Sequence, residues 1–303
     1  MFMETRLMRR RSFINQMTTL TGVTLAGATQ IMCSATPKYK MGLQLFSVRE
    51  ALANDPLDTL RKVKKMGYED FESYGFNPKT KKIYGFYISE FKKVLDDLNL
   101  TTTSGHYGFS EYFDSSKDKL KWFVDQCIIA SKTLNAPFIT WPWVHPDKRN
   151  PESFKILADK LNLIGEQVKS ADLGFAYHNH GYEFQNWGGT SGHDILMKIT
   201  DKNLVKLQMD MYWVIHSGKT PKELVDKHPG RYVMWHIKDM DKITRDYSEL
   251  GNGSIDYEKE LPDAEKSGMK YYYIEQGGNY ASTDIESAAT SATYFKKNLR
   301  HLI

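Results

Sequence analysis

The chain has 303 residues, of which 41% are hydrophobic and 13% aromatic, so it can bury one large core or two smaller ones. It contains 41 Lys and Arg residues against 37 acidic ones, a formal net charge of +4. This near balance argues against nucleic acid as a partner, because proteins that bind nucleic acid usually concentrate Lys and Arg well beyond neutrality.

The first 35 residues differ in kind from the rest. Arg10-Arg11-Ser12-Phe13-Ile14 is followed by a mildly apolar run and then by small residues up to Ala35. This order is typical of a twin-arginine export signal, and the alternative is a basic N-terminus followed by a short helix. We expect a signal segment at residues 1–35, and an exported, periplasmic protein that has no membrane attachment once the signal is removed.

Removal of this segment takes away four Arg and one Glu, which leaves 37 basic and 36 acidic residues. The mature chain then has no excess of basic charge. Cys127 would be its only cysteine, and its apolar neighbours predict a buried, unpaired thiol.

From residue 38 onward, short apolar runs alternate with longer amphipathic ones about eight times, as in a (β/α)₈ barrel of ~250 residues. The expected strands are 41–46, 68–73, 100–104, 138–141, 174–178, 205–210, 232–236 and 271–275. The expected helices begin near Pro56 and then cover 88–98, 117–134, 151–171, 194–200, 221–227, 257–266 and 285–302. We therefore predict an α/β fold with a single TIM barrel at residues 38–303.

A doubly wound open sheet is the competing fold, and the ends of the strands separate the two. An open sheet gathers its functional residues around one switch point, whereas polar residues end nearly every strand here. The residues at the strand ends are Ser47, Glu72, His106, Trp141, His178, Asp210, His236 and Glu275, all polar except the aromatic Trp141.

The apolar run that begins at Phe175 turns abruptly into His178, His180 and Glu183. His178 and His180 are two residues apart on a strand and should point to the same side. Together with Asp210, His236 and Glu275 at later strand ends, His178 or Glu183 would complete a mixed N/O ligand set. Such a set suits one divalent cation such as Mn²⁺, Co²⁺ or Zn²⁺.

Six segments in this order and spacing resemble the sugar phosphate isomerase/epimerase family of xylose isomerase-like TIM barrels. They are Gly42–Arg49, Tyr177–Phe184, Leu207–Asp210 with Tyr212-Trp213, His236–Asp239, Gly251–Asp256 and Ile274–Gln276. The resemblance implies one divalent metal ion (Mn, Co, Zn or Mg) held by Asp210, His236, Glu275 and a fourth residue. Where many members have Glu-Asn-His after the fifth strand, this chain has His178-Asn179-His180, so either His178 or Glu183 is the fourth ligand.

The resemblance also implies a small-molecule carbohydrate substrate and proton abstraction next to a metal-chelated carbonyl. Candidate catalytic residues are Glu275, Glu183, His178, His180 and Lys238, with Lys238 placed to neutralise oxyanion charge. Substrate contacts are expected from His106, Trp141, Gln44, Glu72 and Trp213. The glycines at 251, 253, 277 and 278 offer backbone N–H groups to a phosphate, although such clusters are also ordinary turns.

The expected function is a metal-dependent sugar isomerase, epimerase or lyase. Export favours a substrate without phosphate, such as a 3-keto-glycoside opened by elimination. The alternatives are a carbohydrate-binding barrel without catalysis and an abasic-site endonuclease-like metallohydrolase, which would need more His and carboxylate ligands than these strand ends offer. A homo-oligomeric state stays open.

Overall fold

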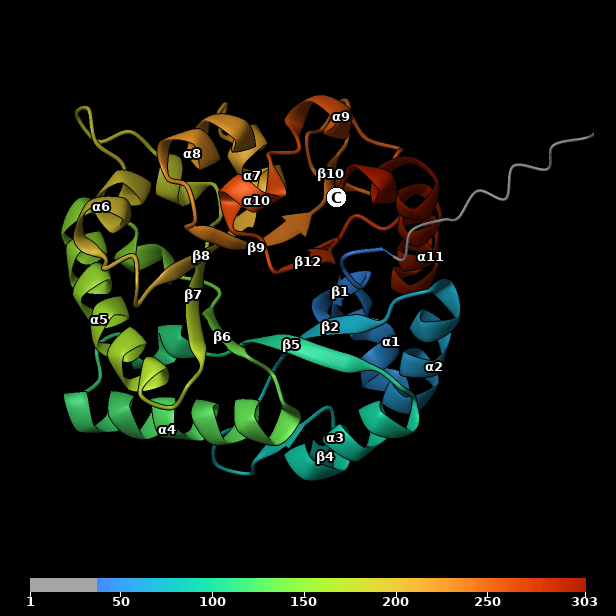
Figure 1. The fold of residues 1–303 in the computed structure, drawn as a ribbon, viewed down its shortest axis with the longest axis horizontal. Coiled ribbons are helices and arrows are strands. Elements are labelled where there is room, and N and C mark those ends of the chain that lie inside the picture. The colour runs from blue at the N-terminus through green and yellow to red at the C-terminus, as the bar shows by residue number, and fades with distance from the viewer. Residues whose placement is uncertain (1–36) are drawn as a thin grey trace, which may run out of the picture. The chain divides into compact units, whose positions relative to one another are not determined.

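Eight parallel strands close into a barrel in the computed structural model, which describes residues 37–303. The ring runs β1, β2, β5, β6, β7, β8, β9 and β12, and β12 pairs with β1 to close it. Figure 1 shows the helices wrapped around the outside of the strands. The strands are β1 (Gly42–Gln44), β2 (Asp70–Tyr74), β5 (Thr101–His106), β6 (Phe138–Trp141), β7 (Gly174–His178), β8 (Lys206–Asp210), β9 (Tyr232–Ile237) and β12 (Tyr271–Ile274). The predicted single TIM barrel is confirmed.

The outer helices begin and end at residues suited to those positions. In α2 (Pro56–Met66), the Asp55 side chain accepts a hydrogen bond from the backbone of Asp58, and Gly67 ends the helix at a left-handed φ of 99°. The other long helices are α3 (Ile88–Asp97), α4 (Lys117–Leu134), α5 (Pro151–Lys169), α6 (Gly192–Ile199), α8 (Pro221–Lys227) and α11 (Asp284–Tyr294).

Two expected helices differ from the prediction. Residues 257–266 form two short helices, α9 (Tyr257–Glu260) and α10 (Ala264–Ser267), because Pro262 between them lacks the N–H that a continuous helix needs. The last helix, expected at 285–302, leaves α-helical geometry after Tyr294 and continues as a π-helical and then a 3₁₀ turn.

Several short elements in the loops were not predicted from the sequence. The strand pairs β3 (Lys82–Ile83) with β4 (Phe86–Tyr87) and β10 (Asp239–Met240) with β11 (Tyr247–Ser248) follow barrel strands β2 and β9. Helices α1 (Arg49–Asn54) and α7 (Met211–His216) also follow barrel strands. All of them are too short to show a hydrophobic period.

The barrel interior has an apolar layer and a polar layer. The apolar cluster consists of Phe138, Ala176, Val233, Met234 and Tyr273, and it is separate from the larger core between strands and helices. The polar layer consists of Gln44, Glu72, Ser104, Gln208 and His236, all with 0% exposure. Buried polar groups need partners, so this layer is the natural place to look for a site.

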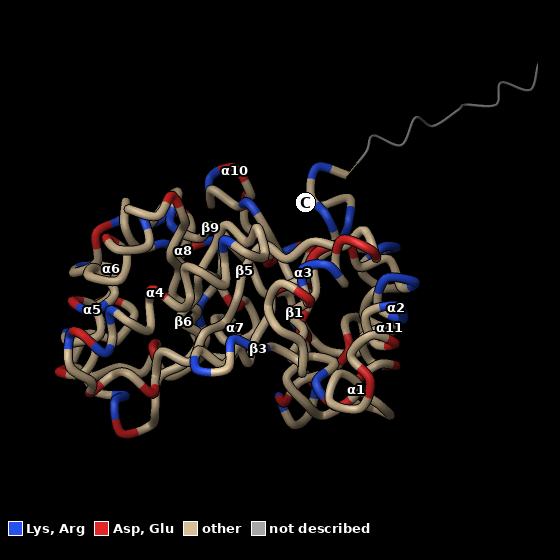
Figure 2. Tube along the Cα trace, turned by 90° about the horizontal axis from the view of Figure 1, so that it is seen from below, with Lys and Arg blue, Asp and Glu red and all other residues tan. Residues whose placement is uncertain are grey.

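Residues 37–303 form one compact unit, and none of its helices is long and apolar enough to cross a membrane. Cys127 is fully buried in α4, as expected. Figure 2 shows Lys and Arg interspersed with Asp and Glu over the outer layer. The expected signal segment lies outside the described residues, so export and periplasmic localisation stay predictions.

Candidate active site

Four side chains from consecutive strands of the ring meet at the C-terminal mouth of the barrel. His178 ends β7, Asp210 ends β8, His236 lies in β9 and Glu275 directly follows β12. Each offers a nitrogen or oxygen atom, and these atoms all lie within 4.8 Å of one another. Two imidazoles and two carboxylates form a donor set that suits a borderline divalent cation.

Asp210 uses its two carboxylate oxygens for different purposes. Oδ1 accepts a hydrogen bond from the backbone N of Trp213 at 3.3 Å and so caps the start of α7. Oδ2 lies 3.3 Å from His178 Nε2 and 3.8 Å from His236 Nδ1. Asp210 is therefore both a helix cap and a member of the polar group.

His178 joins this group, and Glu183 does not. His178 Nδ1 lies 3.1 Å from the carbonyl oxygen of Pro142, to which it donates, so the Nε2 lone pair faces Asp210. Burial lowers the pKa of His178 to about 4, which keeps the ring neutral as a metal ligand must be.

Glu183 is fully buried behind the site. Its Oε1 accepts from the Tyr177 hydroxyl at 2.6 Å and its Oε2 accepts from the backbone N of His180 at 2.9 Å. This position does not support the expected roles of Glu183 as a ligand or as an acid–base group. The carboxylate instead holds the loop that carries His180.

Two buried atoms fit the proposed metal ion. His236 Nδ1 and Glu275 Oε2 lie 2.5 Å apart, and Glu275 Oε2 also lies 2.8 Å from Lys238 Nζ. Neither atom has a hydrogen bond of acceptable geometry among the described residues. Buried polar atoms without a well-formed hydrogen bond are uncommon in native structures. Because both face the same point near Asp210 and His178, the residues present fit a divalent cation.

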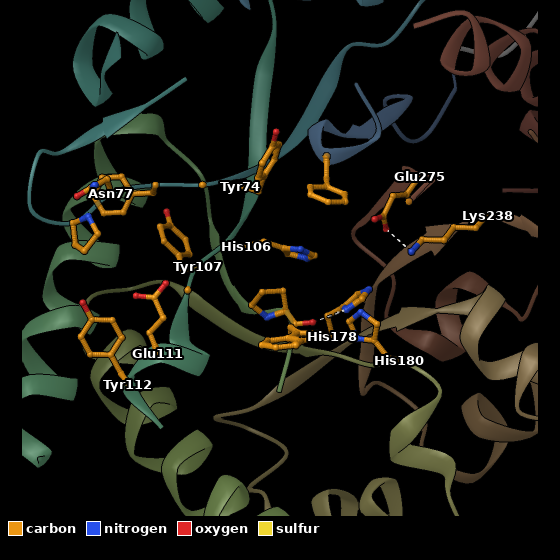
Figure 3. Close-up of a pocket in the computed structure, with 18 of the residues that line it drawn as sticks. Tyr74, Asn77, His106, Tyr107, Glu111, Tyr112, His178, His180, Lys238 and Glu275 are labelled. Carbon is orange, nitrogen blue, oxygen red and sulfur yellow. Dashed lines mark hydrogen bonds and ion pairs between the residues drawn. The ribbon is translucent and has the colours of Figure 1, made fainter. Parts of the chain in front are cut away.

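Lys238 brings a positive charge to the same point. Its Nζ lies 2.6 Å from Asp210 Oδ2 and 2.8 Å from Glu275 Oε2, and Figure 3 shows it turned toward Glu275. Burial lowers the pKa of Lys238, but the two carboxylates outweigh burial and raise it above its usual value. The side chain therefore stays protonated.

A cavity of about 810 Å³ opens beside this group, within the range of small-molecule sites. Figure 3 shows an elongated arrangement, with Lys238 and Glu275 at one end, His106 in the middle and Glu111 and Tyr112 at the other end. Its aromatic lining consists of Phe46, Tyr74, Phe76, Tyr107, Tyr112, Trp143 and Tyr247. Such rings suit the apolar faces of sugars.

His180 lines the cavity next to His178. Its ring stacks on Tyr182, with centroids 5.2 Å apart and an interplanar angle of 11°. Burial, together with the nearby His178 and Lys238, holds the pKa of His180 well below its usual value. A neutral imidazole can accept a proton, but it is a poor source of one, so His180 is better suited to act as a base than as a general acid.

Among the expected substrate contacts, only His106 lines the cavity. Trp141 has 0% exposure, because its ring stacks on Phe109 and its Nε1 donates to the carbonyl oxygen of Trp143. Gln44 and Glu72 also have 0% exposure and lie in the polar layer. Trp213 packs against His180 behind the cavity wall, with ring centroids 5.7 Å apart.

Sequence reasoning missed several lining residues that lie at the end of β2 or in the loops after β2, β5 and β9. They are Tyr74, Phe76, Asn77, Glu111, Tyr112 and Tyr247. Their position after a barrel strand is the one signal that marks them, because loops at this face of a TIM barrel form the site.

Replacing Glu183 with Gln should flatten the pH dependence of stability. Burial raises the pKa of Glu183 to about 7 from 4.5, so the folded state binds the proton more tightly than the unfolded chain does. The stability from this group is present below about pH 4.5 and is lost as the pH rises toward 7. Between pH 5 and 8, the free energy of unfolding should fall less in the variant, by on the order of 2–3 kcal/mol. Urea unfolding of both proteins at both pH values measures this, and equal changes would contradict it.

Comparison with known proteins adds to this geometry. The model of the xylose isomerase-like TIM barrel family matches residues 60–298. Inosose dehydratase of Clostridium perfringens is 31% identical over 169 residues, which cover 49% of this chain and 56% of that protein. The chain spans about half the length of the curated relatives it matches.

Solved structures show the same architecture. A sugar phosphate isomerase/epimerase of Parabacteroides distasonis has a TM-score of 0.75 and 27% identity, covering 90% of this chain and 99% of that one. A xylose isomerase-like TIM barrel protein of Mycobacterium smegmatis, in complex with magnesium, has a TM-score of 0.63 and 16% identity, covering 87% and 97%. The second comparison supports the fold alone.

Proposed function

Because this chain belongs to the xylose isomerase-like TIM barrel family, we propose that it is a divalent-metal-dependent lyase or isomerase acting on a carbohydrate with a carbonyl group. The observation that carries this proposal is the meeting of His178, Asp210, His236 and Glu275 at one end of the elongated cavity. His236 Nδ1 and Glu275 Oε2, which face this point without a well-formed hydrogen bond among the described residues, support the metal.

The proposed reaction begins with loss of a proton from the carbon next to the carbonyl. A divalent cation in this site would polarise the carbonyl and make that proton more acidic. His180 is neutral and borders the cavity, so it can accept the proton. Lys238 keeps a positive charge beside the carboxylates, where it stabilises negative charge that develops on the substrate oxygen.

The position of Glu183 favours one base over two. A two-base epimerisation needs acid–base groups on opposite faces of the substrate, and Glu183 is buried and engaged by Tyr177. In a one-base elimination, His180 takes the proton from carbon and passes it to the leaving oxygen. The C–H and C–O bonds break, a C=C bond forms, and water or an alcohol leaves. The partial similarity to inosose dehydratase supports a lyase of this kind.

The loop at Gly251 and Gly253 supports a substrate without phosphate. The backbone N–H groups of Gly251 and Gly253 donate to Asp239 Oδ2 at 2.9 and 3.2 Å, so neither is available to a phosphate group. The cavity also extends from Glu275 to Glu111 and Tyr112, which leaves room beyond one reacting sugar ring. A 3-keto-glycoside, whose second half is the leaving group, fits this length.

A turnover screen tests the proposal. The purified protein, supplied in turn with Mn²⁺, Co²⁺, Zn²⁺ and Mg²⁺, is offered keto-sugars, inososes and 3-keto-glycosides in deuterated water. We expect metal-dependent deuterium uptake into the substrate or release of water or the aglycone. Carbohydrate binding without turnover and without metal would point to a binding barrel instead.

A further inference from the structure

Glu72 is a buried carboxylate at the centre of the polar layer, and the proposed reaction gives it no role. Its Oε2 accepts from Gln44 Nε2 at 2.7 Å and from His236 Nε2 at 2.6 Å. Its Oε1 accepts from Ser104 Oγ at 2.6 Å and from Gln208 Nε2 at 2.7 Å. A carboxylate with 0% exposure is costly to bury, and these four donors, with His106 Nε2 3.0 Å from Oε2, offset that cost.

The backbone is irregular where this network is built. The pairing of β2 with β5 shifts register between Phe71 and Glu72, and the pairing of β8 with β9 shifts between Leu207 and Gln208. Such bulges change the direction of a side chain locally and are common next to active sites. Both shifts lie at residues of the Glu72 network.

We propose that Glu72 is a positioning residue that orients His236 for the metal ion. By accepting from Nε2–H, it holds a proton on that nitrogen and turns Nδ1 toward Glu275 Oε2 and Asp210 Oδ2, so that Nδ1 is the nitrogen that would bind the ion. Carboxylates that accept from the outer nitrogen of a metal-binding histidine fix its tautomer and ring orientation. This inference rests on the metal site of the proposed function, but not on the reaction or the substrate.

A second metal ion held by Glu72, His106 and His236 is the competing explanation, since their donor atoms also lie close together. The hydrogen bonds argue against it. His106 Nε2 donates to Gln208 Oε1 at 2.7 Å, and His106 Nδ1 accepts from Gln44 Nε2 at 3.3 Å. His106 Nε2 also lies 3.0 Å from Glu72 Oε2, so the donor and acceptor atoms of this group satisfy one another. His236 Nδ1 and Glu275 Oε2, in contrast, have no well-formed hydrogen bond among the described residues.

Glu72→Gln tests the inference through metal affinity. A glutamine has nearly the same shape, but its amide can donate to His236 Nε2. This favours the tautomer of His236 that carries its proton on Nδ1, and a protonated Nδ1 cannot bind the metal ion. Affinity for Zn²⁺ or Co²⁺, measured by competition with a chromophoric chelator, should fall about 10- to 100-fold. Glu72→Asp retains the carboxylate and should recover part of this loss.

Asp70→Asn is the matched control. Asp70 is a buried carboxylate on the same strand, two residues before Glu72, and it accepts from the hydroxyls of Thr101 and Thr103 away from the site. This variant should bind metal like the wild type. Equal affinities of Glu72→Gln and the wild type would overturn the inference, while a wild type that binds no divalent cation would overturn the proposed function as well.

A measurement on the wild-type protein tests the role of Glu72 even if Glu72→Gln fails to fold. The protein is labelled with ¹⁵N at histidine and loaded with ¹¹³Cd²⁺ as a probe. We expect cadmium–nitrogen coupling on Nδ1 of His236 and a proton on Nε2. Coupling on Nε2 would refute the role of Glu72, and two cadmium ions per chain would indicate the second metal site.

Discussion

Asp210→Asn should lose the metal ion and turnover together. The asparagine retains an oxygen that caps α7 through the backbone N of Trp213, but it lacks the charged oxygen that faces His178, His236 and Lys238. Loss of a metal ion that stabilises developing charge by several kcal/mol should lower turnover by on the order of 10³-fold or more. Metal content by elemental analysis and turnover of the same preparation check this result.

Asp55→Asn provides the control for this variant. Asp55 also caps a helix, since its side chain accepts from the backbone of Asp58, and it lies outside the cavity lining. The control should keep both metal and turnover. An Asp210→Asn protein with full metal content would show that Asp210 acts as a helix cap alone.

His180→Ala should lower turnover by about 10² to 10⁴-fold, the usual contribution of a proton-transferring group, with metal content unchanged. His180 borders the cavity but is not one of the four side chains whose donor atoms converge. Comparison of metal content with turnover therefore separates a proton acceptor from a ligand.

The matched variant is His145→Ala, which removes an exposed histidine outside the cavity lining and should be active. If His180→Ala loses its metal, His180 must be assigned as a ligand. If the variant retains full turnover, the proton acceptor must be sought elsewhere, with Glu275 as the next residue to test.

The convergence of Asp210, His236 and Glu275 could be anticipated from sequence for a simple geometric reason. Each lies at or near the end of a short buried run, and parallel strands of a barrel all end at the same face. The barrel followed from the repeated strand–helix pattern and the family from the six motif segments, and both are confirmed. That these residues bind metal stays a prediction.

The direction of a single side chain was harder to predict. Neighbouring residues on a strand point to opposite faces, so Trp141 at the end of β6 was not certain to face the cavity, and it packs on Phe109 instead. Glu183 lies five residues past the last residue of β7, where the alternation of side chains along a strand no longer predicts their direction. Its carboxylate accepts a hydrogen bond from the Tyr177 hydroxyl.

The hydrogen-bond network around Glu72 could not be predicted from the sequence either. A glutamate near a strand end looks the same in sequence whether it contacts a substrate or supports a histidine. The distinction depends on register shifts at Glu72 and Gln208, which come from the pairing of strands far apart in the chain. Local sequence carries no sign of such a shift.

Lys238 offsets negative charge of the site even when no metal ion is bound. Its ammonium group contacts both Asp210 and Glu275, so the carboxylates have a counter-ion that belongs to the chain itself. Small metal-dependent domains unfold without their ion because nothing else compensates the ligand charges. In this barrel the apoprotein should remain folded, so the ion can leave and return without unfolding of the barrel. Loss of metal would then be a reversible change of activity instead of a step toward degradation.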